Sequence, residues 1–365
     1  MSKYLPLEIG NWKLDILPKP PLYGPVVLTM IRVLPLILLA LPLAAQRNED
    51  HSPPSYAALH LGPLTLGNAR RADGLRINFR DHEAEQVRGI NLTLWAPRDD
   101  PLRRMYGLAT GIAPAGSYLA GASIGLLASV WDGPAAGLLV GGLATVSGST
   151  VQGAAIGGLA SVVGGDVDGL AVGTLASVAG GSLRGLGLGG LAVVVGEGAE
   201  ALTVGGLAAV VGDDLRGIGV GGLAAVAGGQ VQGLLIGGLA AVAGDDVEGV
   251  AIGGLASVAG GWLTGAAIAA GQVETGGPLR GLAVAGYRIR TPALSGLAVA
   301  IARQDTRLLR GVGIAAYNEV QVQRGLTIGL FNYARELHGV QIGVLNYAGN
   351  NRGVFRMMPV INVHR

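Results

Sequence analysis

The stretch that decides the fold is GIGVGGLAAVAGGQVQ at residues 217–232, which is followed without a break by GLLIGGLAAVAGDDVE at residues 233–248. Both segments are 16 residues long and have the same pattern of glycine, leucine, alanine and valine. Self-similarity at a fixed period is typical of a repeat architecture, in which each unit packs only against its neighbours. The fold therefore follows from this unit and its repetition.

The same unit extends in both directions along the chain. It restarts at 16-residue intervals from Gly121 to Gly281, with Ala201 in place of one glycine, and the interval then shortens to 15 and 14 residues. Degenerate units precede this array and begin at Gly74, Gly89 and Gly107.

Each position of the unit has its own residue preference. The fourth is β-branched in most units, the seventh is leucine from Leu127 to Leu255, and the tenth is valine from Val130 to Val258. This composition, without a helical apolar stripe, predicts short strands separated by turns. A 14–16-residue unit is too short for a helix pair, a propeller blade or a leucine-rich repeat. We therefore predict an all-β fold, a parallel β-solenoid with one coil per unit.

An outer-membrane antiparallel β-barrel, with one strand per unit, is the alternative fold, and the sixteenth position discriminates between the two. It carries charges of alternating sign at Asp168, Arg184, Glu200 and Arg216. In a parallel solenoid these side chains would stack about 4.8 Å apart and attract one another. In an antiparallel barrel, consecutive turns lie at opposite rims and the alternation has no purpose. The column favours the solenoid, although the apolar outer faces suit a barrel.

The N-terminal residues predict export. Residues 1–29 contain every lysine of the chain, and we expect them to precede the true start at Met30. Residues 30–45 combine one arginine, an apolar stretch and two final alanines, as in a secretory signal peptide. A membrane anchor is the alternative, but the apolar core is short for a bilayer. We expect residues 47–106 to form an irregular N-terminal cap with short strands and residues 107–365 to form the β-repeat domain.

Composition excludes several kinds of protein. Without cysteine the chain has no disulfide framework or thiol nucleophile. Once residues 1–45 are removed, acidic and basic residues are equal in number, so nucleic acid is not an expected partner. Charge is nevertheless uneven, because the middle of the chain is acidic and the C-terminal part is rich in arginine.

The last units carry a recognisable pattern, GLTIGLFNYARELH at 325–338 and GVQIGVLNYAGNNR at 339–352. This pattern resembles the bacterial surface-repeat proteins of unknown function first named from leptospiral sequences, which have a signal peptide and GLQIGLxN-type tandem repeats. The resemblance covers about residues 74–365 and implies export and a surface location. Between Gly121 and Gly281 the units depart from it, with Gly-Gly-Leu-Ala in place of Gly-Leu-x-Asn.

Two polar or aromatic columns stand out in these last units. Stacked asparagine amides can donate and accept along a solenoid axis, and neighbouring aromatic rings can form a binding stripe. The predicted structural ladder is Asn318, Asn332 and Asn346, and the candidate binding stripe is Tyr317, Tyr333 and Tyr347.

Signals for catalysis or metal binding are weak. The five histidines form no HExxH or i, i+4 pair, and the serines replace alanine in a packing column. Acidic groups on the turns are the weak calcium candidates, although a solvated edge explains them better. These candidates are Asp166, Asp168, Asp245, Asp246 and Glu248. We expect no cofactor.

Together these features predict a non-enzymatic, exported protein of a bacterial surface or outer membrane, acting as a scaffold or an adhesin-like binding surface. Its expected partners are envelope lipid, a surface protein or polysaccharide, or a second copy. An integral outer-membrane barrel is the alternative. A polysaccharide-acting enzyme is a third hypothesis, which would need a carboxylate pair set apart from the repeat.

Overall fold

The computed structural model describes residues 58–97 and 102–365 of the chain. The chain divides into two units, Met1–Pro53 and Pro54–Arg365, and every described residue belongs to the second. The expected start at Met30 and the signal peptide at 30–45 lie outside the described residues.

Each regular coil contains a seven-residue long strand, a two-residue turn and a four-residue short strand, as in β11 (Val151–Gly157) and β12 (Ala160–Val163). The other long strands are β7 (Leu119–Gly125), β9 (Ala135–Gly141), β13 (Val167–Gly173), β15 (Leu183–Gly189), β17 (Ala199–Gly205), β19 (Leu215–Gly221), β21 (Val231–Gly237), β23 (Val247–Gly253), β25 (Leu263–Ala269) and β27 (Leu279–Ala285). The other short strands are β8 (Ala128–Trp131), β10 (Ala144–Ser147), β14 (Ala176–Ala179), β16 (Ala192–Val195), β18 (Ala208–Val211), β20 (Ala224–Ala227), β22 (Ala240–Ala243), β24 (Ala256–Ala259) and β26 (Gln272–Thr275).

The two ends of the stack are less regular. The first strands are β1 (Ala58–Leu61), β2 (Leu64–Gly67), β3 (Arg71–Asn78), β4 (Gln86–Thr93), β5 (Arg104–Gly111) and β6 (Ala115–Gly116). The last elements are β28 (Arg288–Ala300), β29 (Arg303–Ile314), β30 (Tyr317–Ala348), the short 3-10 helix η2 (Gly353–Arg356) and β31 (Met357–His364). In these C-terminal coils the strands run on through the corners.

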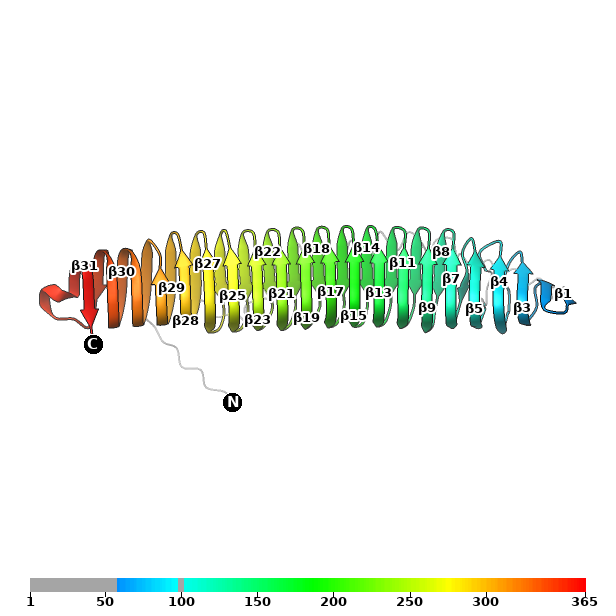
Figure 1. The fold of residues 1–365 in the computed structure, drawn as a ribbon, viewed down its shortest axis with the longest axis horizontal. Helices are drawn as coiled ribbons and strands as arrows, with labels where there is room; N and C mark the ends of the chain where they lie inside the picture. The colour runs from blue at the N-terminus through cyan, green and yellow to red at the C-terminus, as the bar shows by residue number, and fades with distance from the viewer. Residues whose placement is uncertain (1–57, 98–101) are drawn as a thin grey trace, which may run out of the picture. The chain divides into compact units, whose positions relative to one another are not determined.

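Successive coils pair in parallel and in register, so the fold is a β-solenoid, as predicted (Figure 1). Long strand pairs with long strand and short with short, so that Gly169 lies opposite Gly185 and Val178 opposite Val194. The antiparallel barrel is therefore wrong for this chain. Within the described residues, the named strands pair antiparallel only at the two ends, where β1 covers β2 and β31 covers β30.

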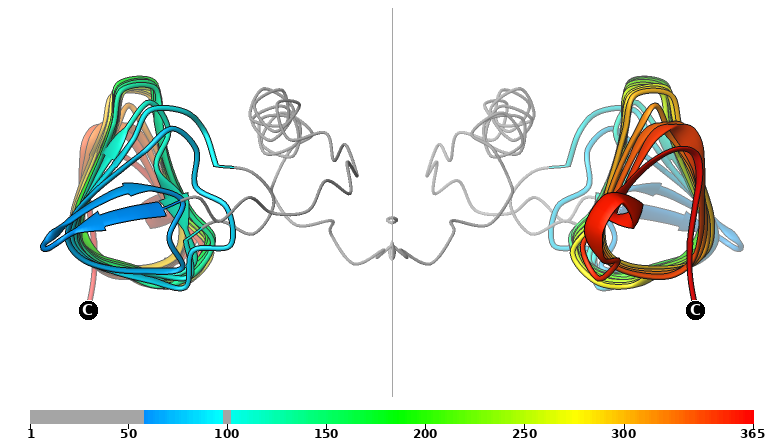
Figure 2. Two further views of the ribbon diagram at one scale, coloured as in Figure 1. Left: turned by 90° about the vertical axis from the view of Figure 1, so that its right-hand side faces the viewer. Right: turned by 90° about the vertical axis from the view of Figure 1, so that its left-hand side faces the viewer.

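The coils enclose a narrow core of small and medium-sized side chains. On a long strand the inward positions hold residues such as Val151 and Ala155, and on a short strand Ser161 and Val163. Viewed along the axis, the coils have a roughly triangular outline with one narrow corner (Figure 2). The long strands all run towards this corner, where two-residue turns join them to the short strands (Figure 1).

The first position of the unit needs glycine for two reasons. Gly217 has φ +130°, a backbone conformation that residues with a side chain rarely adopt. A methyl group on it would lie 2.4 Å from the carbonyl oxygen of Ala201 in the preceding coil. Ala201 occupies the same column but does not have a positive φ, and its side chain is buried.

The stack begins earlier than the predicted boundary at residues 106 and 107. Strands β3, β4 and β5 pair in parallel with Gly74, Gly89 and Gly107 in one column, which continues into the regular coils. Strands β3, β4 and the start of β5, which the prediction placed in an irregular cap, are thus part of the same parallel stack as the regular coils. The sequence shows degenerate units at Gly74 and Gly89, but their unequal intervals led to the prediction of a cap, because the turns between these strands differ in length while the strands do not.

Candidate interaction surfaces

The alternating charges of the sixteenth position form a ladder on the outer face of the long strands. Asp168 lies opposite Arg184, Arg184 opposite Glu200, and Glu200 opposite Arg216. The nitrogen–oxygen distances are 3.3 Å for Arg184–Asp168, 3.9 Å for Arg184–Glu200 and 3.1 Å for Arg216–Glu200. These side chains are 43–59% exposed, so each pair adds little stability on its own.

Reversing one charge tests this ladder. Arg184→Glu places a carboxylate between Asp168 and Glu200, and we expect a loss of about 1 kcal/mol in unfolding free energy. Denaturant titration measures it, and the loss should shrink at high salt because exposed charges are screened. Arg184→Gln, which removes attraction without adding repulsion, should lose less. Equal stability of Arg184→Glu and the unmodified chain would show that the ladder contributes nothing.

The calcium candidates do not converge on one site. An Asp166 carboxylate oxygen accepts hydrogen bonds from the Ser182 backbone N–H and hydroxyl at 2.8 and 2.9 Å, and Asp246 accepts one from the Trp262 N–H at 2.8 Å. Both residues thus cap the turn of the next coil. The Ser182 hydrogen bonds, from the backbone first, hold the pKa of Asp166 below its usual value. Residues 58–97 and 102–365 contain no group of three histidine, cysteine or acidic side chains that could hold a metal.

The three asparagines form a continuous ladder inside the C-terminal coils. The Asn318 amide donates to the Asn332 side-chain oxygen at 2.8 Å, and Asn332 donates to Asn346 at 2.7 Å. Each amide also donates to a backbone carbonyl, for example Asn332 to Ile342 at 2.9 Å. All three side chains are buried, so the ladder stabilises adjacent coils and offers no surface for recognition.

The candidate tyrosine stripe is only partly present. The Tyr333 and Tyr347 rings stack in parallel with centroids 5.1 Å apart. Tyr317 does not continue this column, because it precedes the buried Asn318 whereas Tyr333 follows Asn332. It lies under the Arg303 guanidinium instead, 5.4 Å from the ring centroid. Burial and the nearby Glu319 carboxylate raise the pKa of Tyr317. Tyr317 therefore lies outside the column of the other two rings, and a binding role for the three tyrosines stays a prediction.

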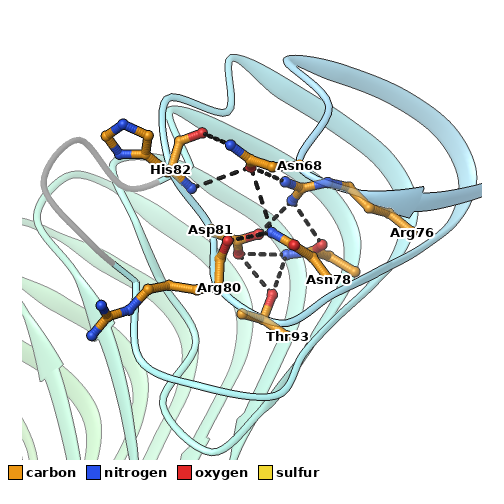
Figure 3. A network of polar contacts seen from close by, with 8 residues as sticks. Asn68, Arg76, Asn78, Arg80, Asp81, His82 and Thr93 are labelled. Carbon is orange, nitrogen blue, oxygen red and sulfur yellow. Dashed lines mark hydrogen bonds and ion pairs between the residues drawn. The ribbon is translucent and has the colours of Figure 1, made fainter. Parts of the chain in front are cut away.

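A buried polar network in the first coils was not predicted (Figure 3). Arg76 is fully buried, and its guanidinium donates to Asp81 at 2.5 Å, to Asn91 at 3.0 Å and to Asn68 at 2.9 Å. Asp81 is also buried and accepts from Asn78, Asn91 and Thr93 at 3.1, 2.9 and 2.7 Å.

The role of this network is structural: its hydrogen bonds hold the first coils together. Both oxygens of the Asp81 carboxylate are occupied by donors, so the group is not available as a general base. The bonds join β3, β4 and the segment between them, which fixes the first coils to one another. The one hint of this network in the sequence is that polar residues occupy positions where the regular units have small or apolar residues.

A row of exposed leucines follows the narrow corner of the coils. Each lies in the two-residue turn between a long and a short strand and is 45–60% exposed. This apolar edge consists of Leu127, Leu143, Leu159, Leu175, Leu191, Leu207, Leu223, Leu239 and Leu255. Single exposed leucines are ordinary, but nine in one column are not. Among the described residues, no helix is long and apolar enough to span a membrane.

No family model, curated protein or solved structure matches the chain. Carboxylates do gather with arginines in a shallow pocket on the charge ladder. Of these, Glu200 binds arginine and Asp214 accepts the Gln230 N–H at 2.8 Å, so both are held by structural contacts.

Proposed function

We propose that this chain is a non-enzymatic, exported protein of a bacterial envelope, in which the solenoid is a rigid scaffold. The observation that carries the proposal is the parallel register, which continues without a break from coil to coil through the regular part of the stack. A rod held by such repeated contacts has no hinge in its regular part. It presents each surface column as a straight line, which suits a scaffold or spacer.

Export is supported by the sequence of residues 30–45 and by the resemblance of the last units to surface-repeat proteins. The scaffold role is supported by how the polar groups are used. The buried Arg76–Asp81 pair, the asparagine ladder and the aspartates of the turns all bind neighbouring coils. They are occupied in holding the stack together.

Export is tested by expressing the chain from Met30, with a C-terminal tag, in a bacterium that has an outer membrane. We expect an envelope protein whose mature N-terminus is Gln46 or Arg47, which N-terminal sequencing identifies. A Leu38→Arg variant, with a charge in the apolar stretch, should remain unprocessed in the cytoplasm. An unprocessed cytoplasmic product from the unmodified chain would overturn the proposal.

The scaffold part has its own test. Purified protein should scatter X-rays as a rod that keeps its length when glycans or lipids are added. A change of length on adding a ligand would favour a conformational role over a scaffold.

A further inference from the structure

The apolar edge is flanked by apolar strips on both sides. Next to Leu223, the outward residues of the long strand are Ile218 and Val220, and those of the short strand are Ala224 and Val226. In the nine coils that begin between Gly121 and Gly249, no charged residue occurs from the second to the eleventh position. The edge and its flanks thus form one apolar surface about 40 Å long.

Charges lie away from this surface. The acidic residues of the middle coils follow the short strand, as Glu197 does, or occupy the charge ladder at the start of the long strand. In cross-section the solenoid is therefore amphipathic, with an apolar narrow corner and charges at the opposite side. Continuous exposed apolar surfaces of this extent mark sites of interaction with lipid or protein.

The shape of the apolar surface favours lipid over a second copy. It is convex, since its two strips meet at the narrow corner of the coil outline (Figure 2). A second solenoid that packs on one strip leaves the other strip and the leucines exposed. A lipid layer is fluid and covers both strips together, as it does for amphipathic helices that insert about 5–10 Å.

The depth of the charged column agrees with this arrangement. The ladder position lies five residues before the end of the long strand, which is about 17 Å of extended chain from the edge. If the edge inserts about 5–10 Å into the layer, the lipid headgroups occupy a zone about 10–18 Å from the inserted edge. The long strand is an inclined side of the coil outline (Figure 2), so the sixteenth position lies at most about 17 Å from the edge, no farther than the outer limit of the headgroup zone.

The arginines of the C-terminal coils are placed for phosphate at this level. Arg280 lies opposite Ser295, Ser295 opposite Arg310, and Arg310 opposite Arg324. Within the part of the chain that the structure describes, none of these arginines has a carboxylate within ion-pair distance, unlike Arg184 and Arg216. Two like charges side by side without a counter-charge are favourable when an anion binds between them.

We propose that the apolar edge lies in the acyl region of a lipid layer, with the solenoid parallel to the membrane surface and Arg280, Arg310 and Arg324 on the phosphates of anionic headgroups. This rests on the proposed envelope location, because an exported chain meets such a layer. The edge binds the layer from one side and does not cross it.

Spin labels on the full chain test the orientation, and the absence of native cysteine allows single labels. Leu191→Cys places a nitroxide on the apolar edge, and Glu197→Cys places the matched control in the same coil beyond the short strand. On vesicles of phosphatidylethanolamine and phosphatidylglycerol, the label at 191 should become accessible to oxygen and protected from a water-soluble nickel chelate. The label at 197 should stay accessible to nickel.

Each outcome decides the proposal. Binding through the N-terminal leader alone would bring both variants to the vesicles with neither label in lipid, which overturns it. Immobilisation and spin–spin broadening at 191 without vesicles would show that a second copy covers the edge. Absence of vesicle binding also overturns it, whereas failure of export with correct insertion in vitro would overturn only the envelope location.

The arginine column has a separate test. An Arg310→Gln/Arg324→Gln variant should bind phosphatidylglycerol-containing vesicles about tenfold more weakly or worse, and should bind pure phosphatidylcholine vesicles as the unmodified chain does. An equal loss on both kinds of vesicle would show that these arginines support the fold and do not recognise phosphate.

Discussion

Gly217→Ala is expected to destabilise the solenoid by about 3 kcal/mol or more, because it combines backbone strain with a steric clash. Alanine at φ +130° is strained in itself, and its methyl group would meet the Ala201 carbonyl oxygen at 2.4 Å. That oxygen belongs to the backbone of a paired strand, so it moves only if the register of β17 and β19 changes. The change is measured by denaturant unfolding together with hydrogen exchange of the coils on each side.

Ala201, which occupies the same column one coil earlier, provides the control for this prediction. Ala201→Gly makes the opposite change one coil earlier, at a position without positive φ, and should alter stability by only about 1 kcal/mol. If Gly217→Ala and Ala201→Gly had similar small effects, the first position would not be under steric control. The glycine column would then reflect composition and not geometry.

Asp81→Asn is expected to cost about 3–5 kcal/mol, because it leaves the fully buried Arg76 guanidinium without a counter-charge. The loss should be local, since coils of a solenoid open from an end without unfolding the rest. Hydrogen exchange should show lost protection in β3, β4 and β5 and unchanged protection in the regular coils from β11 to β23.

The matched control is an exposed pair. Asp168→Asn removes the same carboxylate from a partner that is 59% exposed and should cost about 1 kcal/mol or less. Replacing both buried partners, as Arg76→Met/Asp81→Leu, should recover part of the loss because no buried charge remains. If Asp81→Asn left the first coils fully protected, the network would not be what stabilises these coils.

The regular coils could be predicted from sequence because each side chain recurs at the same point of an identical unit. A fixed period places Asp168, Arg184 and Glu200 at the same point of successive coils, and parallel stacking then makes them neighbours. The asparagine ladder was predictable for the same reason, since its 14-residue spacing equals the length of the last coils.

The parts that sequence did not predict are those where the period fails. Arg76, Asp81 and Asn91 belong to coils of unequal length, so their contact depends on turn conformations that no repeat reveals. Tyr317 and Tyr333 are 16 residues apart in coils 14 residues long, and this difference of two moves Tyr317 across the buried asparagine to the adjacent outward column. Small shifts of register decide which side chains meet.

The antiparallel strands at the two ends have a consequence for the size of the molecule. Each regular coil pairs with the coil before it and the coil after it in the same register. Insertion or deletion of a whole unit would therefore leave strands that still pair. The length of the rod would therefore change in steps of about 4.8 Å, one step for each coil gained or lost. At each end an antiparallel strand, β1 or β31, covers the last parallel strand, so the edge exposed there differs from the edges that the regular coils present to one another.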